Sequence, residues 1–124
     1  MKETGPAQKK ECTAELMALR DSLDMLAGKW TLPVLQYLAN RQQDLNHFGK
    51  LERGVAGISP RMLTRELKML ELNKMIVRTL QQTKPVTVTY AITSYGLTTL
   101  PIIRILVEWG KSHRAMLKAE QNNS

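Results

Sequence analysis

A group of cationic side chains recurs at helical spacing in the second half of the chain. Arg61, Arg65 and Lys68 lie within about 60° of one another on a helix that turns about 100° per residue. The opposite side of that helix is apolar, with Leu63, Leu67 and Leu70. Because the planar guanidinium of arginine binds a guanine edge or a phosphate through paired hydrogen bonds, the cationic face has the chemistry of a DNA-binding surface. Taken alone, the pattern fits a solvated helix face equally well.

The ends of this cationic helix carry residues that favour helix termini. Ser59 is the predicted N-cap and Pro60 lies in the first turn, while Asn73, which tolerates the left-handed conformation, is expected to end the helix. A shorter amphipathic stretch, HFGKLERGV, precedes it, and AGIS between the two predicts a turn. The spacing therefore predicts a helix-turn-helix over residues 47–73.

After this helix the periodicity changes from helical to alternating. Apolar residues interleave with threonine and alanine over 86–93, which predicts a strand, and 77–82 is its predicted partner. Residues 76–93 should thus form a hairpin whose tip is basic, with Thr83, Lys84 and Pro85. A helix-turn-helix followed by such a hairpin is the order of a winged helix-turn-helix, in which the second helix enters the major groove and the wing contacts phosphate or the minor groove.

Within that architecture the candidate DNA-contacting residues form two groups. Side chains toward the start of the cationic helix are expected near base edges, and these are Ser59, Arg61, Thr64 and Arg65. Residues farther along the helix and on the hairpin are expected to contact phosphates, and these are Lys68, Thr83, Lys84 and Thr87.

Leucine-rich helices are predicted before the helix-turn-helix. The first carries a stripe at three- and four-residue intervals, formed by Leu16, Leu19 and Leu23. It is expected to run from Glu15 to Gly28, with the glycine as a left-handed cap, and its stripe belongs either to the core or to a dimer seam. A second, short helix follows, with Thr31 as its predicted N-cap.

Residues 94–120 predict a long terminal helix that is apolar around much of its circumference. Such a surface is expected to be buried against a second subunit, with Ile103, Leu106 and Trp109 at the interface. Pro101 requires that this helix start late or kink. The expected fold is therefore a mainly helical α+β winged helix-turn-helix whose long terminal helices form a dimer.

Length and charge fit this expectation. A chain of 124 residues suffices for one domain, predicted over 13–120 after a flexible arm over 1–12. Lys and Arg number 18 against 11 acidic residues, so the formal net charge is +7 and the pI is near 9.8, which indicates a polyanionic partner or an anionic surface. Between Arg61 and Thr93 six basic and two acidic residues leave a local charge of +4.

Several linked motifs resemble the HxlR-type transcriptional regulators, which are relatives of the MarR winged-helix group. The motifs are AGKWTLPVL, GISPRMLTRELKMLE, PVTVTYAITSYGLTTL and EWG, and the similarity runs from about Cys12 to His113. It implies a dimeric transcription factor on a two-fold symmetric operator, most commonly a repressor, with recognition helices about 34 Å apart. It also points to Lys29 and Trp30, where Lys29 is either a phosphate contact or merely exposed and Trp30 is expected to be core packing.

Because Cys12 is the single cysteine, no intramolecular disulfide can form and a reducing compartment is expected. The sequence also shows no apolar targeting segment, so the expected location is the cytoplasm. Some HxlR-type regulators sense oxidants or electrophiles through an N-terminal cysteine, and the resemblance implies that role for Cys12, with an inert thiol as the alternative. An oxidant or a small molecule is thus the expected kind of effector. Oxidation would join Cys12 to its counterpart in the other subunit.

Other functions have less support in the sequence. His47 and His113 are far apart, and neither metal-ligand spacing, a glycine-rich phosphate loop nor a GxSxG elbow occurs, so we expect no enzyme activity, metal or cofactor. The alternative to a DNA-binding regulator is a winged-helix module that binds only proteins. Salt dependence distinguishes the two, because phosphate contacts make log affinity fall linearly with log salt.

Overall fold

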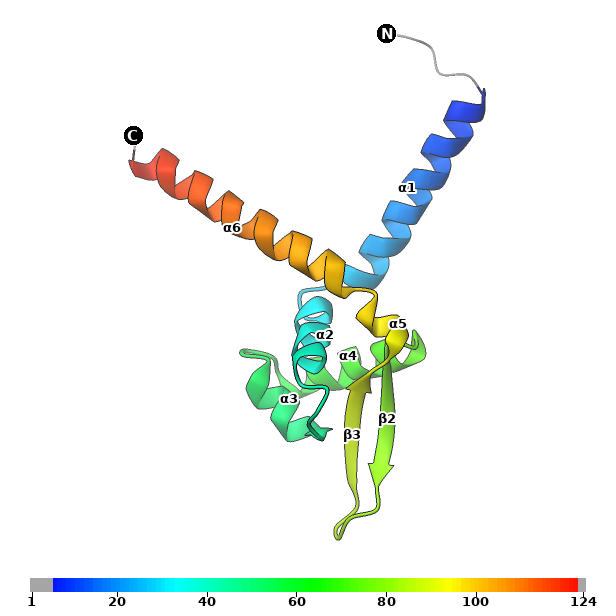
Figure 1. The fold of residues 1–124 in the computed structure, drawn as a ribbon, viewed down its shortest axis with the longest axis vertical. Coiled ribbons are helices and arrows are strands. Elements are labelled where there is room, and N and C mark those ends of the chain that lie inside the picture. Colours follow the sequence, from blue (N-terminus) through cyan, green and yellow to red (C-terminus); the bar gives the residue numbers. More distant parts are fainter. Residues whose placement is uncertain (1–5, 123–124) are drawn as a thin grey trace.

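The chain folds mainly into helices, with a small sheet beside them (Figure 1). The computed structural model describes residues 6–122. Its helices are α1 (Pro6–Leu26), α2 (Thr31–Asn40), α3 (Phe48–Gly54), α4 (Pro60–Leu72), α5 (Ser94–Leu97) and α6 (Leu100–Asn122), and its strands are β1 (Asn46–His47), β2 (Ile76–Gln81) and β3 (Thr87–Ile92). This is the mainly helical α+β winged helix-turn-helix that the sequence predicted.

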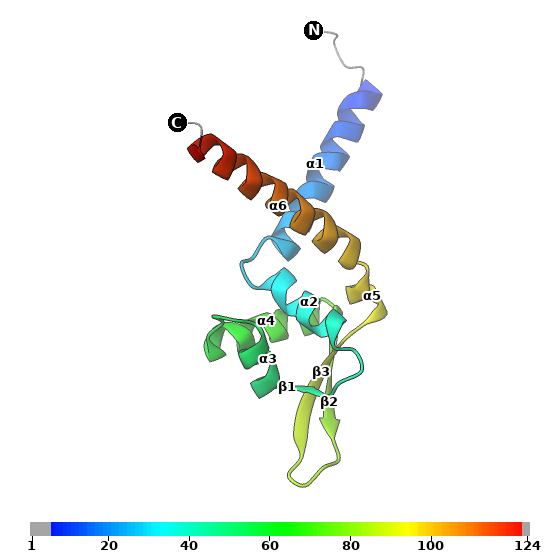
Figure 2. The same ribbon diagram turned by 60° about the vertical axis from the view of Figure 1, so that its left-hand side comes forward.

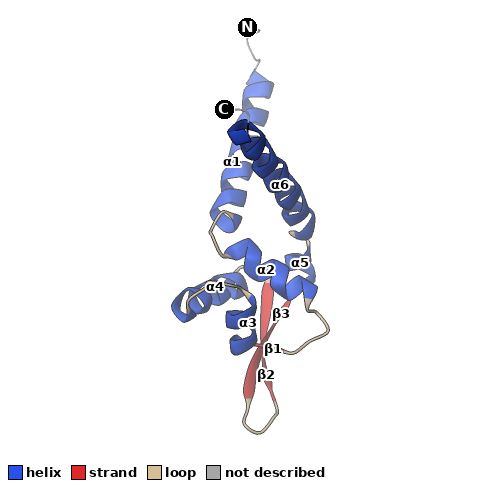
Figure 3. Cartoon of the chain, turned by 90° about the vertical axis from the view of Figure 1, so that its left-hand side faces the viewer, coloured by secondary structure: helices blue, strands red, loops and turns tan. Residues whose placement is uncertain are grey.

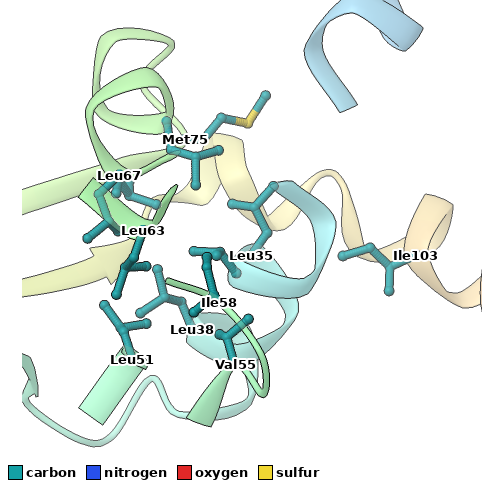
Figure 4. Close-up of a cluster of buried hydrophobic side chains, with 12 residues drawn as sticks. Leu35, Leu38, Leu51, Val55, Ile58, Leu63, Leu67, Met75 and Ile103 are labelled. Carbon is teal, nitrogen blue, oxygen red and sulfur yellow. The ribbon is translucent and has the colours of Figure 1, made fainter. Parts of the chain in front are cut away.

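Leucine side chains from three helices meet in the core of the helix-turn-helix (Figure 4). Leu35 and Leu38 of α2, Leu51 of α3 and Leu63 of α4 are fully buried. The apolar face predicted for α4 is confirmed, since its three inward leucines are at most 2% exposed. Burial of this face fixes the rotation of α4 and leaves its opposite face to solvent.

The two ends of α4 are capped differently. The Ser59 Oγ accepts a hydrogen bond from the Met62 N–H at 3.2 Å, which confirms the predicted N-cap. At the other end Asn73 is the C-cap, which confirms the predicted end of the helix, but its φ of −88° is not left-handed. The left-handed residue is Lys74, with a φ of 62°, while Asn73 donates through Nδ2 to the Met69 carbonyl at 2.9 Å.

The junction between α1 and α2 also corrects two predictions. Helix α1 ends at Leu26, and Gly28 has no positive φ, so it is not a left-handed cap. Helix α2 begins at Thr31 with Trp30 in the cap position, and the Thr31 hydroxyl donates to Glu66 Oε2 at 3.0 Å instead of capping. The buried Glu66 carboxylate needs a hydrogen-bond donor, because burying a carboxylate without one is costly. This hydrogen bond between distant segments outweighs the preference of Thr31 for capping its own helix.

The sheet contains three strands, one more than the predicted hairpin (Figure 3). Strands β2 and β3 form the hairpin, with Val77 opposite Ala91, and β1 pairs antiparallel with the other edge of β3. Asn46 of β1 is 1% exposed and donates through Nδ2 to the Arg41 carbonyl at 2.9 Å. A two-residue strand carries no readable periodicity, so its pairing arises only in the tertiary structure.

Helices α1 and α6 diverge from each other at the end of the molecule opposite the hairpin (Figures 1 and 2). Because α1 begins at Pro6, the predicted flexible arm over 1–12 is wrong for residues 6–12, and residues 1–5 lie outside the described part. A proline in the first turn followed by good helix formers explains the early start. Helix α6 begins at Leu100 with Pro101 in its first turn, so the late start predicted as one alternative is confirmed.

Among the described helices, none combines the length with the apolar composition that crossing a membrane requires.

Candidate DNA-binding surface

The cationic face of α4 is solvent-exposed along its length. Arg61, Arg65 and Lys68 are all exposed, on the side away from the buried leucines. Thr64 lies among them and is also exposed. The four side chains therefore project from one rigid helix, which is the arrangement that the sequence predicted.

The two hydroxyl groups on this face differ in what they can still offer. Ser59 Oγ accepts from the Met62 N–H, so its own proton remains available to a ligand. Thr64 Oγ1 donates to the Pro60 carbonyl at 2.9 Å, so it retains acceptor capacity only. Ser59 can therefore donate to a phosphate oxygen or to an acceptor on a base edge, whereas Thr64 can accept from a base amino group.

Glu66 holds α4 against α2. Its side chain is 7% exposed, and its carboxylate accepts the hydrogen bond from the buried Thr31 hydroxyl. The Gly28 backbone packs against this pair, because a Cβ at Gly28 would lie 2.9 Å from Thr31 Oγ1. The acidic residue of α4 nearest the cationic face in sequence thus points into the core and does not neutralise that face.

The hairpin tip carries one cation between two threonines, and all three residues are exposed. Thr83 Oγ1 lies 2.8 Å from the Pro85 carbonyl, to which it donates, and 3.1 Å from Thr87 Oγ1. Because Thr83 has one proton, Thr87 is then the donor between the two hydroxyls. Thr83 and Thr87 were predicted to contact phosphates, but both hydroxyl protons are engaged within the turn. The Lys84 ammonium is therefore the donor that the tip presents to a ligand.

A hollow of about 660 Å³ lies between α4 and the hairpin, and we call it the α4–hairpin hollow. Its polar and charged lining consists of Thr64, Lys68, Glu71, Lys74, Arg78 and Tyr90. Of the residues predicted to contact DNA, the structure brings Thr64 and Lys68 into this lining. Sequence analysis did not assign Lys74 or Arg78, although both belong to the basic segment between Arg61 and Thr93.

The sequence that forms α4 and the hairpin matches a known family. A family model described as HxlR-like helix-turn-helix matches residues 25–118. The chain belongs to the HxlR-like helix-turn-helix family. The resemblance found in the sequence motifs is thereby confirmed.

Curated relatives of this HxlR-like chain are helix-turn-helix regulators. The uncharacterized HTH-type transcriptional regulator YybR of Bacillus subtilis is 30% identical over 102 residues, which cover 82% of this chain and 79% of YybR. An uncharacterized HTH-type transcriptional regulator of Methanothermobacter thermautotrophicus is 33% identical over 109 residues, 88% of this chain and 78% of that protein. The chain is therefore a helix-turn-helix transcriptional regulator.

A solved structure shows the same fold. The redox regulator HypR in its reduced form superimposes with a TM-score of 0.72 at 29% sequence identity, over 82% of this chain and 98% of HypR. The similarity covers both the helix-turn-helix and much of the terminal helices.

Lys29 lies elsewhere in this HxlR-family regulator. It is exposed at the junction of α1 and α2, with its Nζ 5.0 Å from the centroid of the Trp30 ring, and it lines a groove between α1 and α6. It is not among the residues of the α4–hairpin hollow. The structure therefore does not group Lys29 with the cationic face, and its assignment as a phosphate contact rests on the sequence alone. Trp30 packs against the core, as predicted.

The terminal helices expose much of their apolar surface. The predicted interface residues Leu16, Leu19, Leu23, Leu106 and Trp109 are 46–65% exposed. Ile103 corrects the prediction, because it is 5% exposed and packs in the core, so it is not available to a partner. Between α1 and α6 lies a groove of about 530 Å³, lined largely by leucine and isoleucine.

The cysteine and the two histidines, which are the side chains considered as reactive or metal-binding groups, lie on different elements of the fold. Cys12 is exposed on α1, His47 accepts the Lys50 N–H at 3.3 Å through Nδ1, and the His113 ring stacks on Trp109 at 4.9 Å between centroids. Within residues 6–122 no group of three or more His, Cys, Asp or Glu side chains is arranged to hold a metal ion.

Proposed function

We propose that this regulator binds a two-fold symmetric operator as a homodimer, with α4 of each subunit in the major groove. One observation carries the proposal: an exposed row of Arg61, Arg65 and Lys68 stands on a helix whose other face is locked in the core. A rigid cationic helix beside a basic hairpin is complementary in shape and charge to duplex DNA. Nothing in the family comparison favours a module that binds only proteins.

Each part of the surface has a proposed task. Arg61 and Arg65 read base edges, with Ser59 and Thr64 beside them. Lys68 and Lys84 bind phosphates, while Thr83 and Thr87 orient the hairpin tip around Lys84. Lys29 is retained as a separate phosphate contact, outside the cationic face.

The dimer is proposed from the apolar surface of the terminal helices. Leu16, Leu19 and Leu23 of α1 and Leu106 and Trp109 of α6 are too numerous and too exposed for a lone subunit, and a second copy would cover them. Pairing through these helices would place the two α4 helices about 34 Å apart, so that they enter successive major grooves on one side of the DNA.

The remaining proposals concern organisation and regulation. We infer a single domain over residues 13–120, with the helix-turn-helix at 47–73, the wing at 76–93 and the dimerisation helix at 94–120. We expect this regulator to be located in the cytoplasm and to lack enzyme activity. We expect it to act as a repressor of transcription, the commonest role in the family.

The test is a DNA-binding titration at several salt concentrations with the wild type and Arg65→Ala. We expect log affinity of the wild type to fall linearly with log salt, and Arg65→Ala to weaken binding to the selected operator by about 1 to 3 kcal/mol more than binding to random duplex. Lys118→Ala, on the exposed surface of α6, is the matched control. An affinity that does not depend on salt would instead support the protein-interaction module.

A second proposal gives Cys12 a sensing role. The thiol is exposed on α1, next to the proposed dimer seam, and the structural neighbour HypR is described as a redox regulator. Two Cys12 thiols, one from each subunit, would lose two protons and two electrons to diamide, form one disulfide and shift the spacing of the two α4 helices. We expect diamide to change the operator affinity of the wild type but not of Cys12→Ser, and an equal response of both proteins would refute this role.

A further inference from the structure

The turn that ends α4 requires a left-handed residue. The Met75 N–H bonds to the Leu70 carbonyl at 2.9 Å and the Lys74 N–H bonds to the Glu71 carbonyl at 3.0 Å, which together define a Schellman motif. The residue after the C-cap Asn73, directly before Met75, is then left-handed, and glycine occupies this position most often because a Cβ is unfavourable there. Here it is Lys74, with a φ of 62°.

Surrounding contacts keep this backbone in place. Thr93 Oγ1 lies 2.7 Å from the Lys74 carbonyl and 3.0 Å from the Met75 carbonyl, and Met75 itself is in the core. The fold therefore dictates the conformation, and lysine bears a cost that glycine would not. Backbone conformations of this kind cluster at functional sites, so the Lys74 side chain is a candidate for a functional role.

The Lys74 side chain lines the α4–hairpin hollow together with Lys68 and Arg78. Glu71 also lines the hollow, so three positive groups and one negative group leave a net charge of about +2 there. Lys68 comes from α4, Arg78 from β2 and Lys74 from the turn that joins them, so the cations surround the concave corner on its two sides and at its apex.

Duplex geometry indicates what fills this corner. With α4 in the major groove and the Lys84 tip at the adjacent minor groove, the sugar-phosphate strand that separates the two grooves must cross the space between α4 and the hairpin. That space is the α4–hairpin hollow. We propose that Lys74, with Lys68 and Arg78, seats a phosphate of this strand, and that a lysine occupies the left-handed position because its ammonium binds that phosphate. The proposal deepens the proposed function and rests on it.

Three substitutions at one position separate charge from backbone strain. Lys74→Gly removes both the ammonium and the strain, Lys74→Asn removes the ammonium at a residue that tolerates the left-handed conformation, and Lys74→Arg keeps the charge. We expect Lys74→Gly to raise the melting temperature by about 3 to 6 °C. At about 0.1 M salt, its affinity for random duplex should fall about three- to tenfold, and the plot of log affinity against log salt should become less steep, with a slope less negative by about 0.9 per subunit. Lys74→Asn should lose the same affinity, and Lys74→Arg should keep it.

Lys118→Gln, which removes an exposed positive charge on α6, is the matched control and should keep the wild-type affinity and slope. If Lys74→Gly and Lys74→Asn bind DNA with the wild-type slope, or if Lys118→Gln loses as much affinity as they do, the phosphate seat is refuted while the proposed function stands. If the wild type itself shows no salt-dependent binding to DNA, the proposed function fails, and the seat with it.

Discussion

Apolar side chains are buried where α2, α3 and α4 pack together, but many are exposed on the terminal helices α1 and α6. Leu35 of α2 and Leu63 and Leu70 of α4 are completely buried, whereas Leu19 of α1 and Leu106 of α6 are at least half exposed. The two regions also lie at opposite ends of the molecule (Figure 2). The end that we propose to face DNA thus has a complete core within one chain, while the other end exposes an apolar surface that we propose a second copy covers.

The largest expected effect tests the core of the DNA-facing end. Leu63→Ala should lower the free energy of unfolding by about 2 to 5 kcal/mol, because it leaves a cavity among the leucines of α2, α3 and α4. Urea denaturation followed by circular dichroism measures this loss. Leu72→Ala is the matched control, since Leu72 lies on the same helix and is 80% exposed, and its effect should stay within about 0.5 kcal/mol. Equal losses at both positions would contradict the contrast between buried and exposed faces.

An intermediate effect is expected where the terminal helices meet their partner. Leu106→Glu places a charge on the exposed apolar stripe of α6 and should raise the dissociation constant of the dimer about 30- to 100-fold, equal to about 2 to 3 kcal/mol. Sedimentation velocity at micromolar concentration reports the change, and the helical circular dichroism signal should persist. Lys118→Glu, on the side of α6 away from this stripe, should leave the dimer intact. A wild type that is already monomeric under these conditions would rule out the proposed pairing.

The smallest effect is expected at the hairpin tip. Lys84→Ala should reduce affinity about threefold for operator and random duplex alike, because a phosphate contact carries no sequence information. The free energy of unfolding should change by less than about 0.5 kcal/mol, since the side chain is exposed. Titration against both duplexes at several salt concentrations gives the result. A loss confined to the operator would mean that Lys84 reads bases.

Much of the functional surface is predictable from the sequence because it depends on local periodicity. The positions of Arg61, Arg65 and Lys68 follow from helical spacing, and Ser59 follows from the preference for small polar residues at N-caps. The hairpin is predicted by the alternation of apolar and polar residues, and its basic tip is predicted by the residues that lie between the two strands. Each of these features depends only on residues within about four positions along the chain.

Other features depend on contacts between distant segments. Thr31 is a buried donor and not a cap because Glu66, 35 residues later, needs a partner. Ile103 belongs to the core and not to the exposed face because α6 packs its first turn against α2. The helical periodicity of the sequence predicts neither the role of Thr31 nor the burial of Ile103, since each depends on which helix packs against that residue in the folded chain.

The class of the protein, the cationic helix and the hairpin can be predicted from the residues alone, because helical and strand periods and end-capping residues act over short stretches of chain. The packed fold is needed to show that Lys74 and not Asn73 is left-handed, and that Lys68, Lys74 and Arg78 surround one hollow. The reason is geometric: a turn's handedness is set by the bonds that close it from both sides, and a shared concave surface exists only once α4 and the hairpin have packed together.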